Sequence, residues 1–260
     1  NFVAGYHELA YGLNLKEIVA ILTKSGVNED RITIIEGWNN KEVAAYLEKA
    51  GLISATDFLK VAADDLRPSF EGEFEFLSDK PFQSGLEGYL FPDTYRVFKN
   101  TSGADIIRKM LQNFGQKLTP ALRAEITRQN KTIFEIIVMA SILEKEVRTP
   151  EDMKLVADIF YKRLKIGQGL QSDATINYVT GKGLVRSTAE DLKINSPYNT
   201  YKYAGLPPGP IANPGLNAIL AAIYPAANSY YYFLTTADGM VIYSKNYEEH
   251  LVNKRKYLSF

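Results

Sequence analysis

The 260-residue chain contains no cysteine, only two histidines, His7 and His250, and a single tryptophan. Without cysteine there is no disulfide, no thiolate metal site and no cysteine nucleophile. The two histidines lie far apart in the sequence and form no metal-ligand pattern, so neither a histidine-based triad nor a zinc site is expected. The sequence therefore predicts a protein that works without a metal or another cofactor.

Long hydrophobic runs and an excess of one charge are also missing. No segment reaches the roughly 18–20 apolar residues that a membrane span requires. Lysine and arginine together number 30, as do aspartate and glutamate, so nucleic acid is not an expected partner. Because the chain begins with Asn1 and not with methionine, we expect a trimmed or mature form that has lost any preceding anchor or signal.

Helical and strand patterns follow one another in mixed order, which is typical of an α+β protein. Periodicity, caps and breakers predict helices over residues 15–25, 41–50, 54–61, 104–117, 120–128, 132–146, 150–166 and 216–222, and from about Tyr247 onward. Strands are predicted over residues 31–35, 73–76, 230–236 and 240–244. Asp238 and Gly239 predict a two-residue turn between the last two.

The most informative helix is the one predicted after Lys131. Thr132 and Glu135 have the spacing of a capping box, in which each side chain accepts a hydrogen bond from a free backbone N–H. The residues that follow, up to Leu143, are apolar around the whole circumference, as in helices buried on all sides. Glu144 comes directly after them, so a buried helix brings a carboxylate to the end of its apolar part.

Helix geometry favours Glu144 over Glu146 as the chemically active acid. Side chains three and four positions back lie beneath a helical residue, so Glu144 stands over Ala140 and Ser141. These small residues would leave room for a ligand, and the apolar wall would raise the pKa of Glu144 toward the value that a general acid needs. A second interpretation stays open: the charged residues simply mark where the helix reaches water.

Five stretches, in this order and spacing, resemble the MltG/YceG-like endolytic murein transglycosylases of the bacterial cell wall. They are EGYLFPDTYRV (Glu87–Val97), ASILEKEV (Ala140–Val147), LQSDATINY (Leu170–Tyr178), SPYNTY (Ser196–Tyr201) and GLPPGPIANPG (Gly205–Gly215). The resemblance covers roughly Leu86 to Phe260. It implies a YceG-like catalytic domain over residues 86–260, preceded by a small LysM-like α+β module over residues 1–85.

The resemblance also implies an activity and a location. The family cleaves nascent peptidoglycan glycan strands internally, between N-acetylmuramic acid and N-acetylglucosamine, and leaves 1,6-anhydro-N-acetylmuramic acid ends. Its catalytic glutamate matches Glu144. It implies a domain outside the bacterial cytoplasmic membrane, held by one N-terminal transmembrane helix that this sequence lacks. Glycan strands are the expected partner, strand termination the expected role, and wall-synthesis polymerases are further candidate partners.

The polar residues of the matching loops are candidates for orienting sugar hydroxyl and N-acetyl groups. They are Gln171, Ser172, Asp173, Thr175, Tyr198, Asn199 and Thr200. For each of them, hydrogen bonds that only hold the loops together are an equally good interpretation. Glu87 and Asp93 are expected to brace the core, and Glu146 to lie at the surface or behind the residues that contact substrate.

Three alternatives stay open at this level. The first is a glycan-binding scaffold of the wall-synthesis machinery that has a pocket but no turnover. The second is a two-carboxylate muramidase that leaves a reducing end, which would require Asp173 to lie close to Glu144. The third is a lyase that acts on a small metabolite, which the long aromatic loops disfavour.

Overall fold

The computed structural model describes residues 9–23, 29–64, 70–81, 84–98, 101–183, 187–236 and 238–258. The helices are α1 (Leu15–Thr23), α2 (Asn40–Lys49), α3 (Ala55–Ala62), α4 (Gly103–Lys117), α5 (Pro120–Arg128), α6 (Ile133–Glu146), α7 (Pro150–Lys165), α8 (Asp173–Thr180), α9 (Leu216–Ile223) and α10 (Tyr247–Tyr257). Three single-turn 3₁₀ helices are η1 (Phe70–Gly72), η2 (Glu75–Leu77) and η3 (Asp191–Lys193). The strands are β1 (Glu29–Thr33), β2 (Thr94–Phe98), β3 (Tyr232–Thr235) and β4 (Val241–Ser244).

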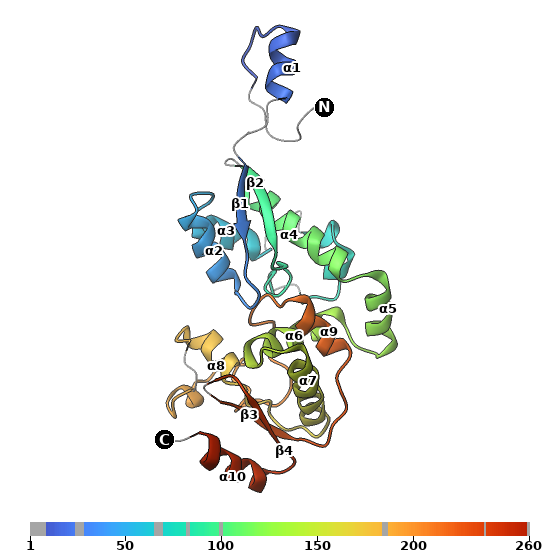
Figure 1. Ribbon diagram of the computed structural model, residues 1–260, viewed down its shortest axis with the longest axis vertical. Helices are drawn as coiled ribbons and strands as arrows, with labels where there is room; N and C mark the ends of the chain where they lie inside the picture. The colour runs from blue at the N-terminus through green and yellow to red at the C-terminus, as the bar shows by residue number, and fades with distance from the viewer. Residues whose placement is uncertain are drawn as a thin grey trace.

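The described strands form two separate antiparallel pairs, and most other elements are helical, which confirms an α+β fold. The molecule is elongated (Figure 1), with α1 standing apart at one end and α10 at the other. The pair β1–β2 lies with α2, α3 and α4 in the upper half, and β3–β4 lies in the lower half with α7 and α8. Helices α6 and α9 lie between the two halves.

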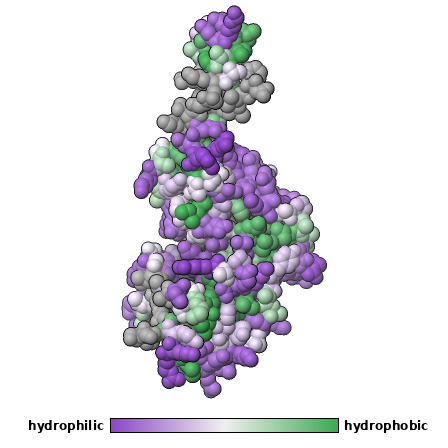
Figure 2. Space-filling model, viewed as in Figure 1, coloured by the Kyte–Doolittle hydropathy of each residue, from purple (hydrophilic) through white to green (hydrophobic). Residues whose placement is uncertain are grey.

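A single hydrophobic core connects the two halves. Its buried residues run from Ile32 in β1 to Ile223 at the end of α9, and α6 contributes six of them from its buried stretch between Ile136 and Leu143. The sheet in the upper half pairs Ile32 with Tyr95, so it draws one strand from each side of the division predicted at residues 85 and 86. That division stays a prediction. On the face in Figure 2, the surface is mainly hydrophilic, with apolar residues gathered in smaller patches.

Local capping signals placed the helix starts correctly. In α6 the capping box of Thr132 and Glu135 is present, because each side chain accepts a hydrogen bond from the other residue's backbone N–H. Helices α5 and α7 begin as predicted with a threonine cap followed by a proline in the first turn. These signals act within one turn and need no tertiary context.

Two local predictions were wrong. Residues 73–76 do not form a strand: Glu73 and Phe74 lie between η1 and η2, and Glu75 and Phe76 begin η2. Phe74 is half-buried, and Phe76 is buried in the aromatic cluster of Tyr89 and Phe114. The β3–β4 hairpin exists, but its strand pairing ends at Thr235 and Val241, so the connection is longer than a two-residue turn. At residues 73–76 tertiary packing overrode the alternating pattern. The hairpin connection is set locally, since the N–H of Gly239 donates to the carbonyl of Thr236 at 2.9 Å and Gly239 takes a positive φ of 90°.

Candidate active site

Glu144 lies in the last turn of α6, immediately after the fully buried part of the helix. Ser141, Ile142 and Leu143 are buried, Glu144 is half-buried, and Lys145 is exposed. The expected arrangement, a carboxylate at the end of a buried helix, is therefore present. Helices α5, α7, α8 and α9 all contact α6. The backbone that carries Glu144 is therefore held in place from several sides.

The loop formed by residues 205–215 closes over the face of α6 that leads to Glu144. Ser141 Oγ donates to the carbonyl of Val138 at 2.8 Å and accepts from the backbone N–H of Ile211 at 3.0 Å. At the end of the loop, the N–H of Gly215 donates to Glu144 Oε2 at 2.9 Å. The prediction that Ser141 leaves room for a ligand is therefore wrong, because this small residue anchors the loop.

The segment that follows β1 completes the surroundings of Glu144. The N–H of Gly37 donates to the carbonyl of Asn213 at 2.9 Å, and the N–H of Asn213 donates to the carbonyl of Trp38 at 2.8 Å. Lys145 Nζ, next to Glu144 on α6, donates to the carbonyl of Gly37 at 3.2 Å. Three segments that are distant in sequence thus meet at the end of α6.

Burial is the main reason that the pKa of Glu144 lies above the ordinary value for a glutamate. The hydrogen bond from Gly215 lowers this pKa, the negative charge of Glu36 raises it, and the positive charge of Lys145 lowers it. The raising influences win. The carboxyl group of Glu144 therefore holds its proton to a higher pH than an exposed glutamate would, as a general acid requires.

Glu146, two residues further on, has a different environment and a structural role. Its carboxylate accepts hydrogen bonds from the hydroxyl of Ser172 and from the backbone N–H of Ala174, at the N-terminus of α8. Negative charge is favourable at a helix N-terminus, but burial dominates and raises the pKa of Glu146 to about 7. Glu146 is half-buried, and a place behind the residues that contact substrate stays a prediction.

The raised pKa of Glu146 predicts a pH-dependent stability. Because the folded pKa of about 7 exceeds the ordinary 4.5, the folded state binds the proton more tightly, and stability falls as pH rises through this window. Replacing Glu146 by Gln removes the buried charge while keeping an acceptor for Ser172. We expect the variant to equal the natural protein near pH 4.5 and to be more stable by about 2–3 kcal/mol at pH 8.

Thermal unfolding of both proteins between pH 4.5 and 8 checks this prediction. The matched control is Glu248→Gln, which removes an exposed carboxylate on α10 and is expected to leave the pH dependence unchanged. A melting-temperature difference between natural protein and Glu146→Gln that stays constant across this pH range would contradict the assignment.

Four of the predicted binding residues lie inside the protein. Ser172, Thr175, Asn199 and Thr200 are all at most 2% exposed. The Thr200 hydroxyl accepts from the N–H of Ser172 at 3.1 Å and lies 3.0 Å from the Thr175 hydroxyl. The amide of Asn199 donates to the carbonyls of Leu192 and Ile194 at 3.0 and 2.9 Å. These side chains join the loops to one another, since loop backbone without regular partners must be satisfied by polar side chains.

The other three predicted binding residues reach the surface. Gln171 is exposed and takes a positive φ of 53°, while Asp173 and Tyr198 are half-buried. Asp173 Oδ1 accepts from the Tyr201 hydroxyl at 3.1 Å, and its charge acts on Glu146. The charged groups that act on Glu144 are Glu36 and Lys145, whereas Asp173 acts on Glu146, which disfavours Asp173 as the partner acid of a two-carboxylate muramidase.

Glu87 braces the core as expected. It accepts from the backbone N–H of Asn40, the first residue of α2, at 2.9 Å, and from the Tyr178 hydroxyl at 3.5 Å. Burial raises its pKa to about 8. Asp93 is exposed, yet it links β2 to α4 by accepting from the side-chain amide of Asn113 at 2.9 Å.

Sequence reasoning missed three residues at the end of α6: Glu36, Asn213 and Gly215. The pair Glu36-Gly37 carried one usable signal, because a glycine between a strand and a helix often takes the positive φ that Gly37 does take, at 80°. Asn213 and Gly215 lie in the family motif of residues 205–215, but no local signal shows their contacts, since their partners come from distant segments.

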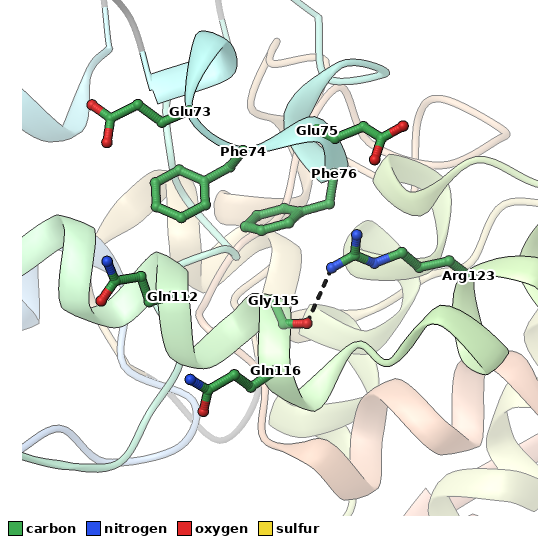
Figure 3. A pocket seen from close by; sticks show the side chains of 8 residues that line it. All are labelled: Glu73, Phe74, Glu75, Phe76, Gln112, Gly115, Gln116 and Arg123. Atoms are coloured by element: carbon green, nitrogen blue, oxygen red, sulfur yellow. Dashed lines mark hydrogen bonds between the residues drawn. The ribbon is translucent and has the colours of Figure 1, made fainter.

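A shallow pocket of about 340 Å³ lies elsewhere, between η2 and the end of α4 (Figure 3). Phe74 and Phe76 form its apolar wall, and Gln112 and Gln116 come from α4. Its cation, Arg123, is occupied by the carbonyls of Gly115 and Leu118 at 3.0 and 2.9 Å. The residues that line this pocket include no candidate nucleophile and no acid with a raised pKa. Glu144 is therefore the better candidate for the catalytic acid.

Among the residues that the structure describes, no three His, Cys, Asp or Glu side chains are grouped so that they could hold a metal ion. Within the same ranges no helix has the length and hydrophobicity to cross a membrane. His7 lies outside the described residues, and His250 stacks on Tyr232 with ring centroids 5.3 Å apart.

Several known proteins are similar to this chain in sequence or in structure. The YceG-like family model matches residues 1–256. An endolytic murein transglycosylase of Bacillus subtilis (strain 168) is 34% identical over 266 residues, covering 99% of this chain and 74% of that protein. One from Streptococcus pneumoniae (strain D39) is 32% identical over 271 residues, covering 95% of this chain, which spans 49% of that protein's length.

The likeness extends to three dimensions. The crystal structure of a yceG-like protein from Listeria monocytogenes superposes with a TM-score of 0.74 at 35% sequence identity. The match covers 97% of this chain and 85% of the Listeria chain. On sequence and on structure alike, this chain belongs to the YceG-like family.

Proposed function

We propose that the protein is an endolytic murein transglycosylase, a lyase that cuts peptidoglycan glycan strands internally with Glu144 as its general acid and base. The observation that carries the proposal is the placement of Glu144: a half-buried carboxyl group with a raised pKa, at the end of a buried helix, fixed by the N–H of Gly215. The names of the Bacillus and Streptococcus relatives support the same activity.

The reaction needs one group that gives a proton and then takes one. Protonated Glu144 donates to the glycosidic oxygen as the bond from C1 of N-acetylmuramic acid breaks, and N-acetylglucosamine leaves with a free hydroxyl group. The C6 hydroxyl then attacks C1, and the Glu144 carboxylate accepts its proton as the 1,6-anhydro ring closes. No water or second nucleophile is consumed, and the 2-acetamido group assists by stabilising positive charge at C1. General acid–base action of this kind contributes about 10²–10⁴-fold to the rate.

The setting of the enzyme is part of the proposal. We place it outside the cytoplasmic membrane, held by an N-terminal anchor that precedes this sequence, where it ends the elongation of nascent strands beside the polymerases. Residues 1–85 are proposed as a LysM-like module and residues 86–260 as the catalytic domain. Gln171, Asp173 and Tyr198, which reach the surface, are the proposed contacts to sugar hydroxyl and N-acetyl groups.

The mass of the products tests the activity. Incubation of purified glycan strands with the protein is expected to give internal fragments that end in anhydro-N-acetylmuramic acid, each lighter by one water than a hydrolysis product. Mass spectrometry of the released muropeptides distinguishes the outcomes. Reducing ends would indicate a muramidase, and binding without cleavage would indicate a scaffold; either result would overturn the proposal.

A further inference from the structure

The segment that follows β1 places a second carboxyl group beside Glu144. Glu36 is exposed, and its carboxyl group lies against Gly215, where a Cβ atom would come within 2.0 Å of Glu36 Oε1 and 2.2 Å of its Cδ. The N–H of the same glycine donates to Glu144 Oε2 at 2.9 Å. Two acids from distant segments thus contact one residue.

The conformation of Gly215 shows why a glycine stands there. Its φ of −75° and ψ of 172° lie in the extended region that any residue adopts. Backbone conformation therefore does not require glycine. The contact with Glu36 favours glycine instead, because a side chain at this position would push the Glu36 carboxyl group away from the loop and from Glu144.

The position of Glu36 is fixed by the backbone next to it. Gly37 and Trp38 exchange two hydrogen bonds with Asn213, which is fully buried, and Lys145 Nζ donates to the carbonyl of Gly37 at 3.2 Å. Within the described ranges, the Glu36 carboxylate has no hydrogen bond or salt bridge that would neutralise it. A fixed, unpaired negative charge therefore faces the site.

The charged groups around Glu144 leave Glu36 as its negative neighbour. Lys145 is the cation that acts on Glu144. Helix α9, packed on α6, carries no charged residue. From α7 and α8, Arg163 and Asp173 act on Glu146. A negative charge nearby disfavours the ionised form of a carboxyl group, so Glu36 adds to the effect of burial in holding the proton on Glu144.

We propose that Glu36 is a positioning residue for the transglycosylase reaction, the ionised partner that keeps the catalytic proton on Glu144 until the glycosidic oxygen takes it. This inference rests on the proposed function and adds a residue to it. It also gives the part of the chain before residue 86 a share in the active site, in addition to any binding or spacing role. The N-terminal segment and the domain that carries Glu144 then act as one catalytic unit.

The pH dependence of cleavage tests this role. Glu144 must be protonated to start the reaction, so activity falls as pH rises through its pKa. Glu36→Gln removes the neighbouring charge, which lowers that pKa, and we expect the basic limb of kcat/KM to move to lower pH. Activity at pH 8 should then fall, while activity near pH 5 stays close to that of the natural protein. Glu36→Asp keeps the charge and should keep most of the limb in place.

A second variant changes Gly215, the residue that the Glu36 carboxyl group contacts. Gly215→Ala keeps both acids and the N–H, but its Cβ would come within 2.0 Å of Glu36 Oε1 and displace that carboxyl group, so we expect a basic limb displaced in the same direction. In the Glu36→Gln background this substitution should add little further displacement of the limb. Gly72→Ala, where a Cβ meets nothing within 4 Å, and Glu248→Gln serve as controls that leave the limb unchanged.

A readout without turnover separates this inference from the proposed function. The ¹³C signal of the Glu144 side-chain carboxyl group, identified by its loss in Glu144→Gln, should titrate at lower pH in Glu36→Gln than in the natural protein. If strands are not cleaved but this midpoint moves, the proposed activity fails and the pairing stands. If strands are cleaved and neither midpoint nor basic limb moves, the pairing is overturned and the activity stands. A loss of rate that is uniform across pH also overturns it.

Discussion

Replacing Glu144 by Gln is expected to lower strand cleavage by about 10²–10⁴-fold, the range attributed to general acid–base catalysis. Glutamine has nearly the same shape and keeps an oxygen that can accept from the N–H of Gly215, so the loop of residues 205–215 should stay in place. It can neither donate a proton to the glycosidic oxygen nor take one from the C6 hydroxyl. Release of anhydro-ended fragments over time, together with strand binding, measures the effect.

The comparison that sharpens this result is Glu146→Gln. Both acids lie on the same helix, both are half-buried, and both have raised pKa values. Glu146, however, is engaged with Ser172 and the start of α8, so we expect a much smaller loss of activity. Equal losses in the two variants, or a Glu144→Gln protein that still cleaves at the natural rate, would contradict the assignment of the acid. We also expect the Glu144→Gln protein to bind strands as the natural protein does.

The end of α6 could be predicted from sequence because its signals are local. A capping box, an all-round apolar stretch and the change to charged residues at Glu144 are all contained within one helix. The family motifs then pointed to the same residue. What lies within a few residues along the chain can be predicted, since helix geometry fixes the relation between neighbours.

The surroundings of Glu144 could not be predicted in this way. The space over Ser141 was expected to be free, but a backbone N–H about seventy residues later in the chain, that of Ile211, uses the serine hydroxyl. The approach of Glu36 to Gly215 likewise depends on how two segments meet. Such contacts follow from the global packing, and no periodicity or spacing in either segment encodes them.

For the polar loop residues too, the sequence did not show which side chains are buried. Sequence favoured Asn199 and Gln171 equally as sugar contacts, yet one is fully buried and the other exposed. The difference is set by which carbonyls lie unpaired nearby: those of Leu192 and Ile194 bind the Asn199 amide. Irregular loops need internal polar side chains for this purpose, and composition does not tell which residues supply them.

Asn213 is where we expect the largest effect on stability. This fully buried side chain accepts with Oδ1 from the N–H groups of Gly88 and Leu90, both at 3.0 Å, and donates with Nδ2 to the carbonyl of Trp38 at 3.0 Å. Asn213→Ala leaves two buried N–H groups without an acceptor. At about 1–3 kcal/mol for each unsatisfied group, we expect a loss of about 3–5 kcal/mol in the free energy of unfolding.

Two further variants identify which atoms of Asn213 matter. Asn213→Asp keeps an acceptor for Gly88 and Leu90 but places a buried carboxylate oxygen against the carbonyl of Trp38 and beside Glu87, so we expect a loss of stability at least as large as in Asn213→Ala. Asn113→Ala is the matched control: this half-buried asparagine only donates, to the Asp93 carboxylate and the Tyr95 hydroxyl, and we expect a loss of about 1 kcal/mol or less. Urea unfolding of all three measures the differences.

The consequence of losing Asn213 should reach the active site, because the same residue holds Gly37 and Trp38 through its backbone and lies two positions before Gly215. If its side chain fixes the loop of residues 205–215, Asn213→Ala should also weaken the Gly215 contact to Glu144 and lower the cleavage rate at temperatures where the protein is still folded. A variant that is as stable as Asn113→Ala would show that Asn213 is not the link between the two halves. Stability and rate that fall together would show that the fold assembles Glu144, Glu36 and Gly215 through this one buried amide.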